Sequence, residues 1–200
     1  MTSELSDRGP FGRAILAIDA ANAEDPNTIE VRGEVRPKEL AHADLMTEWV
    51  ARLDPDATDA QLLAARAHHL RRWTVPRTDY PDGRNGYLRW RTALRKQHAA
   101  EVAELLREVG YDDDTVARVQ GIVDKRGLGR DPAVQTHEDA LCLVFLETQL
   151  ADTVDRLGEE KMLDVIAKTA AKMSPRALAL IEELPMREGD RALLERATSG

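Results

Sequence analysis

Apolar residues recur at helical spacing along most of the chain. Leu45, Trp49 and Leu53 lie four positions apart, which places them on one face of an α-helix. The same pattern predicts helices over about 13–23, 37–53, 59–73, 87–109, 115–125, 159–173 and 175–184, another from Pro132 through the apolar residues 140–146, and a short one near the end. Residues 28–36 are expected to form a short extended piece, too isolated to make a sheet.

The segments between these helices contain residues typical of caps and loops. Ser174-Pro175 pairs a helix cap with a first-turn proline. Residues 75–86 are rich in Pro, Gly, Asp and Asn, which indicates a loop. We therefore predict an all-α protein: a compact single-domain helical bundle over residues 13–200, preceded by a flexible leader at residues 1–12.

The composition supports a helical protein and limits the expected partners and cellular compartment. Only 4% of the residues are aromatic, 32% are charged, and the net charge is −8. A chain of this charge is not expected to bind duplex DNA, although a local basic region can bind a nucleotide or an RNA end. The single cysteine, Cys142, cannot form an internal disulfide, and no apolar run approaches the ~20 residues that a membrane span needs. We expect a cytoplasmic protein with no membrane segment.

Charge is distributed unevenly along the chain. Residues 66–98 contain nine basic and two acidic residues, a net charge of +7, together with two of the three tryptophans and two of the three tyrosines. Arginine binds phosphate and carboxylate groups through paired hydrogen bonds, and aromatic rings can stack on a base. Arg66, Arg95 and Lys96 are expected to be solvated surface charges. We expect an anionic small molecule or nucleotide to be bound by Arg72, Trp73, Arg77, Tyr80, Arg84, Tyr87, Trp90 and Arg91.

Four of the five histidines fall on apolar faces of separate predicted helices. These are His42, His69, His98 and His137. His68 falls on a more polar face, and the acid pair Glu138-Asp139 follows the last of the four. A lone histidine on such a face is most often a core residue, but four on inward faces beside two acids indicate a shared site. Imidazoles with a carboxylate suit Zn²⁺, Mn²⁺ or Fe²⁺ better than Mg²⁺ or Ca²⁺.

The order of these residues resembles the HD superfamily of metal-dependent phosphohydrolases. Its members are helical bundles that bind a divalent metal through a histidine, a His-Asp pair and a distant aspartate. The matching order here is His42, then His68-His69 in place of the His-Asp pair, then Asp139, with His98 as an additional ligand. The resemblance implies an HD-domain-like fold, a metal held by His42, His69, His98 and Asp139, and catalysis involving Glu138 and Asp139.

Four segments of the chain carry a second resemblance. They are DAANAEDPN (19–27), ARAHHLRRWTVPRTDYP (65–81), GYLRWRTALRKQHAAEVAELLREVGYDD (86–113) and HEDALCLVFLE (137–147). They are similar to an uncharacterised bacterial and fungal family whose members often carry the label "glutamyl-tRNA synthetase". The family's recurring motifs match His69, Arg72, Trp73, Pro76, Arg77, Tyr80, Tyr87, Trp90, Arg91, His98, Glu138 and Asp139. His42 and His68 fit that pattern less well, which makes Glu39, one turn before His42, an alternative carboxylate ligand.

The synthetase label implies features that the chain does not have. Class I synthetases need a nucleotide-binding α/β domain with a HIGH-type motif, and the sequence contains neither that motif nor a βαβ pattern. Residues 172–176 (KMSPR) are similar to a KMSKS loop, but a helix end followed by a Ser-Pro helix start explains them. We do not expect an aminoacyl-tRNA synthetase.

Three functions fit these residues. The first is a metal-dependent phosphohydrolase of a nucleotide or phosphorylated small molecule, in which Arg72, Arg77 and Arg91 clamp the phosphate while Tyr80 or Trp90 stacks on the organic part. The second is a non-catalytic binding module for an anionic metabolite or an RNA end, with the inward histidines forming a hydrogen-bonded core. The third, a structural or adaptor bundle, leaves the arginine and aromatic residues unexplained.

Overall fold

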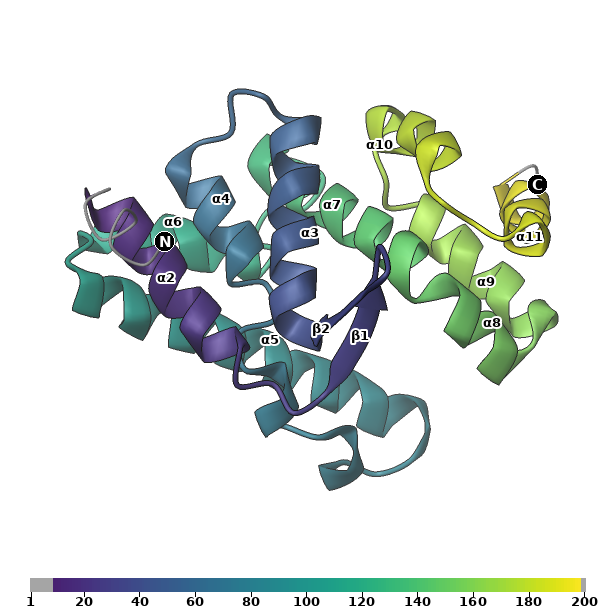
Figure 1. The fold of residues 1–200 in the computed structure, drawn as a ribbon, viewed down its shortest axis with the longest axis horizontal. Helices are drawn as coiled ribbons and strands as arrows, with labels where there is room; N and C mark the ends of the chain where they lie inside the picture. Colours follow the sequence, from purple (N-terminus) through teal and green to yellow (C-terminus); the bar gives the residue numbers. More distant parts are fainter. Residues whose placement is uncertain (1–8, 199–200) are drawn as a thin grey trace. The chain divides into compact units, whose positions relative to one another are not determined.

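The computed structural model describes residues 9–198, which are mostly helical (Figure 1). The all-α prediction is confirmed, since the described residues add only one two-stranded hairpin to the helices. Of the predicted leader, residues 1–8 lie outside the described residues, whereas residues 9–12 form the first turn of a helix. The chain divides into two compact units, residues 1–137 and 138–200. No described helix is both long and apolar enough to cross a membrane.

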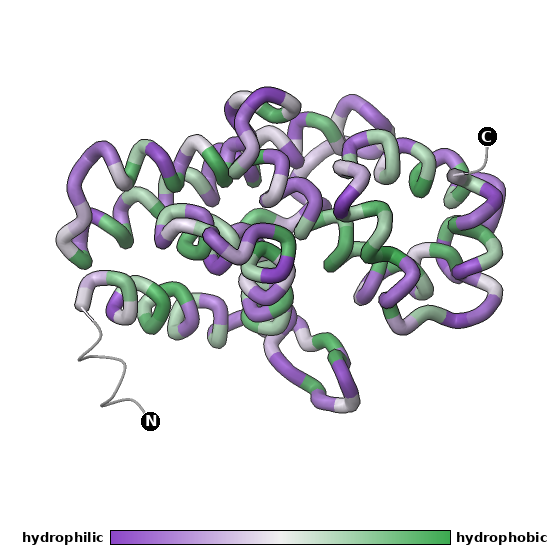
Figure 2. The backbone as a smooth tube through the Cα atoms, turned by 90° about the horizontal axis from the view of Figure 1, so that it is seen from above, coloured by the Kyte–Doolittle hydropathy of each residue, from purple (hydrophilic) through white to green (hydrophobic). Residues whose placement is uncertain are grey.

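The first unit is a group of helices around an apolar core. It contains α2 (Gly9–Asn22), β1 (Thr28–Val31), β2 (Glu34–Pro37), α3 (Lys38–Leu53), α4 (Asp59–Arg66), the 3₁₀ turns η1 (Arg72–Thr74) and η2 (Arg77–Asp79), α5 (Gly83–Val109), α6 (Asp113–Val123) and the start of α7 (Pro132–Thr148). α4 packs against α3 and α6, and α5 packs against α2 and α6. The core between them includes the fully buried Ile18, Leu63, Leu106 and Ile122. Hydrophobic and hydrophilic residues therefore alternate along these helices (Figure 2).

Two helix boundaries follow from local chemistry. Thr58 and Gln61 form a capping box at the start of α4, in which each side chain accepts a hydrogen bond from the other residue's backbone N–H. Gly110 ends α5 with φ of 100°, a left-handed conformation that glycine adopts without steric cost. The predicted end of this helix is confirmed, while its start lies at Gly83, before the predicted Tyr87.

Residues 28–37 form a β-hairpin, so the expectation that they are too isolated to make a sheet is wrong. β1 and β2 pair antiparallel, with Thr28 opposite Pro37 and Val31 opposite Glu34. Arg32 and Gly33 between them both have positive φ, 54° and 84°. Two such residues make the tight turn whose twist matches a hairpin, so the strands pair with each other and need no third strand. The hairpin lies against α3 (Figure 1).

The segment after α4 is the second departure from the predicted helices. A helix was expected over residues 59–73, but α4 ends at Arg66 and residues 67–71 form turns. Side chains from other helices form hydrogen bonds with the backbone of this segment. His98 Nδ1 donates to the Leu70 carbonyl at 2.9 Å, and the Arg71 N–H donates to Asn22 Oδ1 at 3.3 Å. Arg71 itself has a left-handed φ of 49°. His68 and His69 therefore lie in turns, and their positions do not follow helical periodicity.

The loop before α5 is closed by one arginine and one glycine. The Arg77 guanidinium donates to the carbonyl oxygens of Tyr80 at 2.8 Å and Pro81 at 2.9 Å. Gly86, within α5, faces the same loop so closely that a Cβ atom there would lie 1.8 Å from the Pro81 carbonyl oxygen. The loop is therefore held against the first turns of the helix by direct backbone packing.

The second unit is a smaller set of helices. It contains the rest of α7, α8 (Leu150–Leu157), α9 (Glu159–Ala170), α10 (Pro175–Leu180), the 3₁₀ turn η3 (Ile181–Glu183) and α11 (Glu188–Thr198). α9 packs against α8 and α11 and buries Met162 and Ile166. Ser174 caps α10 by accepting a hydrogen bond from Ala177 N, with Pro175 in the first turn. The predicted Ser-Pro helix start in the KMSPR segment is confirmed, but the preceding helix ends at Ala170, before the predicted residue 173.

Candidate metal centre

Glu39 is fixed in the first turn of α3 by a distant carboxylate. The cap residue of this helix, Pro37, has no side chain that can accept from the first N–H groups. Asp25 supplies the acceptor, because its Oδ2 atom receives the Glu39 backbone N–H at 3.0 Å. Its Oδ1 atom accepts from the backbone and side-chain nitrogens of Asn27 at 2.9 and 2.8 Å. The turn that ends α2 therefore positions the residue that begins the site.

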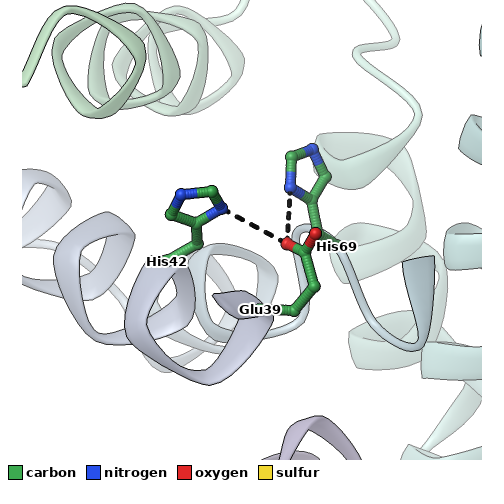
Figure 3. Close-up of side chains that lie close together, drawn as sticks. All are labelled: Glu39, His42 and His69. Carbon is green, nitrogen blue, oxygen red and sulfur yellow. Dashed lines mark hydrogen bonds and ion pairs between the residues drawn. The ribbon is translucent and has the colours of Figure 1, made fainter. Parts of the chain in front are cut away.

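The Glu39 carboxylate lies between two imidazole rings (Figure 3). Its Oε2 atom is 3.0 Å from His69 Nδ1 and 3.4 Å from His42 Nδ1, one helical turn along α3. One ligand atom from each of the three residues can be chosen such that all lie within 4.8 Å of one another. The Glu39 and His42 side chains are 4% and 3% exposed, whereas that of His69 is 18% exposed. The cluster is thus buried on one side and open to solvent at His69.

This donor set can hold a divalent cation. Two imidazoles and one carboxylate occur as the protein ligands of catalytic zinc, and a related pair of histidines with a carboxylate binds non-haem iron. Three protein ligands leave coordination positions for water or substrate. The structure therefore supports the prediction that the chain has a possible metal site, and in this cluster the carboxylate is that of Glu39.

A cation and an aromatic ring border the site. Arg72 Nε lies 3.8 Å from Glu39 Oε1, and Arg72 Nη1 lies 3.3 Å from His69 Nε2. The guanidinium covers the Trp90 ring at 4.9 Å, and Trp90 is itself held by donation from its indole N–H to the Val75 carbonyl at 2.9 Å. Burial lowers the pKa of Arg72 from its ordinary value, and the nearby Glu39 opposes that shift. The arginine thus supplies positive charge directly beside the candidate ligands.

All five histidines lie in the first unit, and their rings form a chain of contacts. The His68 and His69 rings are 4.0 Å apart, His69 and His98 are 5.8 Å apart, and His68 and His137 are 4.9 Å apart. His68 Nδ1 and His137 Nε2 share a hydrogen bond of 2.9 Å. His68 is buried, so its assignment to a more polar face is wrong. The reason is that it lies in a turn, where helical spacing does not determine its direction.

Burial keeps the imidazoles of His68, His69, His98 and His137 neutral. It lowers the pKa of His98 to about 4 and that of His137 to about 3, and it holds the pKa values of His68 and His69 well below the usual 6.5. His98 donates from Nδ1, so its Nε2 atom carries a lone pair. Within the described part of the chain, His98 Nε2, His68 Nε2 and His137 Nδ1 are buried without a hydrogen-bond partner. Neutral imidazole is the form that ligates metals.

The residues predicted as metal ligands fall in both units. His42 and His69 join Glu39, and the His98 ring lies beside that of His69. Asp139 and Glu138 are buried in the second unit, where Asp139 Oδ1 accepts from the Ser174 backbone N–H at 2.9 Å and Glu138 Oε1 lies 3.8 Å from Lys172 Nζ. The catalytic role assigned to these two acids stays a prediction.

Only some of the residues predicted to bind substrate lie at or next to the candidate metal ligands. Arg72 and Trp90 border the candidate metal ligands, and Tyr87 lies next to Trp90, with 6.0 Å between ring centroids. Arg91 lies 5.8 Å from the Tyr87 ring. Arg77 bonds its own loop beside the partly exposed Tyr80, Trp73 is also partly exposed, and Arg84 is exposed. By contrast Arg66, expected to be a solvated charge, is largely buried and paired with Asp19 and Asp44.

The sequence reasoning missed two residues that position the site. Asp25, which holds the Glu39 backbone, and Asn22, which holds the Arg71 backbone, are given no role by the sequence. Both lie in the DAANAEDPN segment that was singled out for its resemblance. Their roles depend on hydrogen bonds to residues far along the chain, which spacing within the segment does not reveal.

Comparison with known proteins identifies a family. The model of a family described as "Domain of unknown function (DUF4202)" matches residues 12–194, nearly the whole chain. No curated protein and no solved structure matches the chain. The family description names neither an HD phosphohydrolase nor a synthetase.

Proposed function

The chain belongs to this DUF4202 family, and from its site we propose that it is a divalent-metal-dependent phosphohydrolase. Glu39, His42 and His69 hold the metal, and the substrate is a nucleotide or another phosphorylated small molecule. The single observation that supports this most strongly is the position of the Glu39 carboxylate, which meets both imidazoles through one oxygen and Arg72 through the other.

The donor set favours Zn²⁺, Mn²⁺ or Fe²⁺. Imidazole nitrogen suits these ions, whereas Mg²⁺ and Ca²⁺ prefer a shell of oxygen ligands. A divalent ion of this kind lowers the pKa of a bound water, which provides hydroxide at neutral pH. Because the His69 side chain is partly exposed, we expect a substrate to approach the cluster from that side.

Arg72 supplies what a phosphate ester needs beside the metal. Its guanidinium has several donors in one plane and matches the oxygens of a phosphate. In the structure it faces Glu39 and His69 on one side and the Trp90 ring on the other. A fixed cation in this position stabilises charge that develops on phosphoryl oxygens during hydrolysis.

The test is a paired substitution of two carboxylates. Glu39→Gln keeps the shape of the side chain and removes its charge, and Glu101→Gln makes the same change at a partly buried glutamate that faces Arg71. We expect purified wild-type protein and Glu101→Gln to retain about one equivalent of metal per chain, and Glu39→Gln to lose it. Hydrolysis of a panel of nucleotides and phosphate esters should be lost with the metal. Two results would overturn the proposal. One is wild-type protein that holds no metal after incubation with Zn²⁺, Mn²⁺ or Fe²⁺, and the other is a Glu39→Gln variant that hydrolyses the panel as well as wild type does.

One observation favours a second function, a non-catalytic module that binds an anionic metabolite. His69 can donate to the Glu39 carboxylate, Arg72 forms an ion pair with that carboxylate at 3.8 Å, and Arg72 can donate to His69 Nε2. The cluster therefore forms a connected polar network by itself. In that case nucleotides raise the melting temperature equally with and without added metal. A phosphohydrolase shows stabilisation by nucleotide that depends on metal.

A further inference from the structure

The first half of α5 presents a concentrated positive charge. Between residues 83 and 100 there is no acidic residue, while the net charge of the whole chain is −8. Five basic residues occupy this part of the helix, all of them exposed: Arg84, Arg89, Arg91, Arg95 and Lys96. The exposed side chains of residues 84–96, called the α5 face below, therefore carry a charge opposite in sign to that of the protein as a whole.

Most of this charge is not neutralised by the protein. Among the residues that the structure describes, Arg84, Arg89 and Lys96 take part in no ion pair, and Arg91 contacts only the Tyr87 ring and hydroxyl. Arg95 is the exception, with Asp124 at 3.0 Å. Several other arginines of this unit are paired with carboxylates, as Arg66 is with Asp19. A helix half with unpaired like charges is destabilised by its own repulsion, which an anionic partner would relieve.

Apolar groups are interleaved with these charges. Tyr87 is 42% exposed and Leu88 is 49% exposed, and both belong to the few large apolar side chains that face solvent. Leu88 lies four residues after Arg84 and three before Arg91, so the three share one helix face. The Tyr87 ring lies beside Trp90, and Trp90 lies beside Arg72 at the metal centre. The α5 face thus combines arginine and lysine side chains with an aromatic ring, and it adjoins the candidate metal site through Trp90 and Arg72.

We propose that residues 84–96 of α5 bind a single-stranded nucleic acid. The helix rises about 1.5 Å per residue, so the basic side chains extend over roughly 18 Å. That length exceeds a small anion and spans several phosphates of one strand. Arginine binds the phosphates and the exposed Tyr87 ring stacks on a base, a combination common to proteins that hold single strands. An acidic peptide matches the charge but leaves the tyrosine ring without a stacking partner, and a duplex hides its bases.

The proposal does not depend on the phosphohydrolase assignment, since binding requires neither metal nor catalysis. It is tested by fluorescence anisotropy with labelled oligouridylate and oligothymidylate, in the presence of a chelator, over a range of salt concentrations. The variant Arg84→Glu/Arg89→Glu/Lys96→Glu reverses three exposed unpaired charges. Its matched control, Arg130→Glu/Arg156→Glu/Lys161→Glu, reverses two arginines and one lysine that are also exposed and make no ion pair within the described residues.

We expect wild type and control to bind at low salt with a strong salt dependence. The α5 variant should bind at least tenfold more weakly, and its slope of log affinity against log salt should be smaller by about 2, because three phosphate contacts are lost. Tyr87→Ala should weaken binding about tenfold with little change in that slope. The two oligonucleotides distinguish RNA from DNA as the preferred strand.

Three outcomes would overturn the proposal. Wild-type protein that binds neither oligonucleotide at low salt is one, and equal weakening by the α5 variant and the control is another. The third is tighter binding of polyglutamate than of either oligonucleotide, which would assign the face to acidic proteins. Circular dichroism of each variant shows that the helices are retained, so that lost binding reports the surface.

Discussion

At the scale of single residues, the surroundings decide what a side chain contributes. Gly86 and Gly121 both lie inside α-helices, where glycine is ordinarily a weak choice. A Cβ at Gly86 would meet the Pro81 carbonyl oxygen at 1.8 Å, whereas one at Gly121 has nothing within 4 Å. One glycine therefore permits a close backbone approach, and the other can be replaced.

Opposite effects are expected when the two glycines are changed to alanine. Gly86→Ala should lower the free energy of unfolding by about 1–3 kcal/mol, because the loop backbone has to move away from α5. Gly121→Ala should raise it by about 1 kcal/mol through reduced backbone entropy in the unfolded chain. Urea unfolding measures both. Equal effects of the two substitutions would contradict the close approach at Pro81.

At the scale of elements, the start of α3 depends on the end of α2. Helix α3 begins after a proline whose side chain cannot cap it, and Asp25 accepts the free Glu39 N–H instead. A helix terminus with unsatisfied donors is unstable unless such an acceptor is supplied. The carboxylate that caps the helix thus also orients the first candidate ligand.

Removing this carboxylate should affect both stability and metal binding. Asp25→Ala should lower the free energy of unfolding by about 1–2 kcal/mol and weaken metal affinity, because Glu39 loses its fixed position. Asp112→Ala removes the cap of α6, which accepts from Thr115 N at 2.8 Å, and provides the control. It should cost about 1 kcal/mol without changing metal affinity. Unchanged metal affinity in Asp25→Ala, measured by calorimetry, would show that the cap does not position the ligand.

For the molecule as a whole, buried neutral histidines make stability depend on pH. The pKa of His137 is lowered to about 3 by burial, with a smaller effect from Lys125, whereas the same group has a pKa near 6.5 in the unfolded chain. Between pH 6.5 and about 3 the unfolded state binds a proton at this group, and the folded state does not. Stability is therefore fully present above pH 6.5 and falls as the pH decreases toward 3.

This dependence can be measured by urea unfolding at several pH values in the presence of a chelator. Between pH 6.5 and 4, wild-type protein should lose stability with a contribution from His137 of up to about 1.4 kcal/mol per pH unit. In His137→Gln that contribution is absent, so the loss should be shallower. Parallel curves for the two proteins would mean that His137 is protonated in the folded state or already neutral in the unfolded one.

The sequence by itself determined the helical class, most helix positions and the residue types of the site. Periodic burial and caps act over a few residues, so Thr58, Gly110 and Ser174 could be recognised locally. Only the tertiary structure decided the turn at residues 67–71, the direction of His68, and the choice of Glu39 as the carboxylate beside His42 and His69. Each of these depends on contacts between residues far apart in the chain, such as His98 with Leu70 and Asp25 with Glu39. Those contacts exist only once the core has brought the helices together.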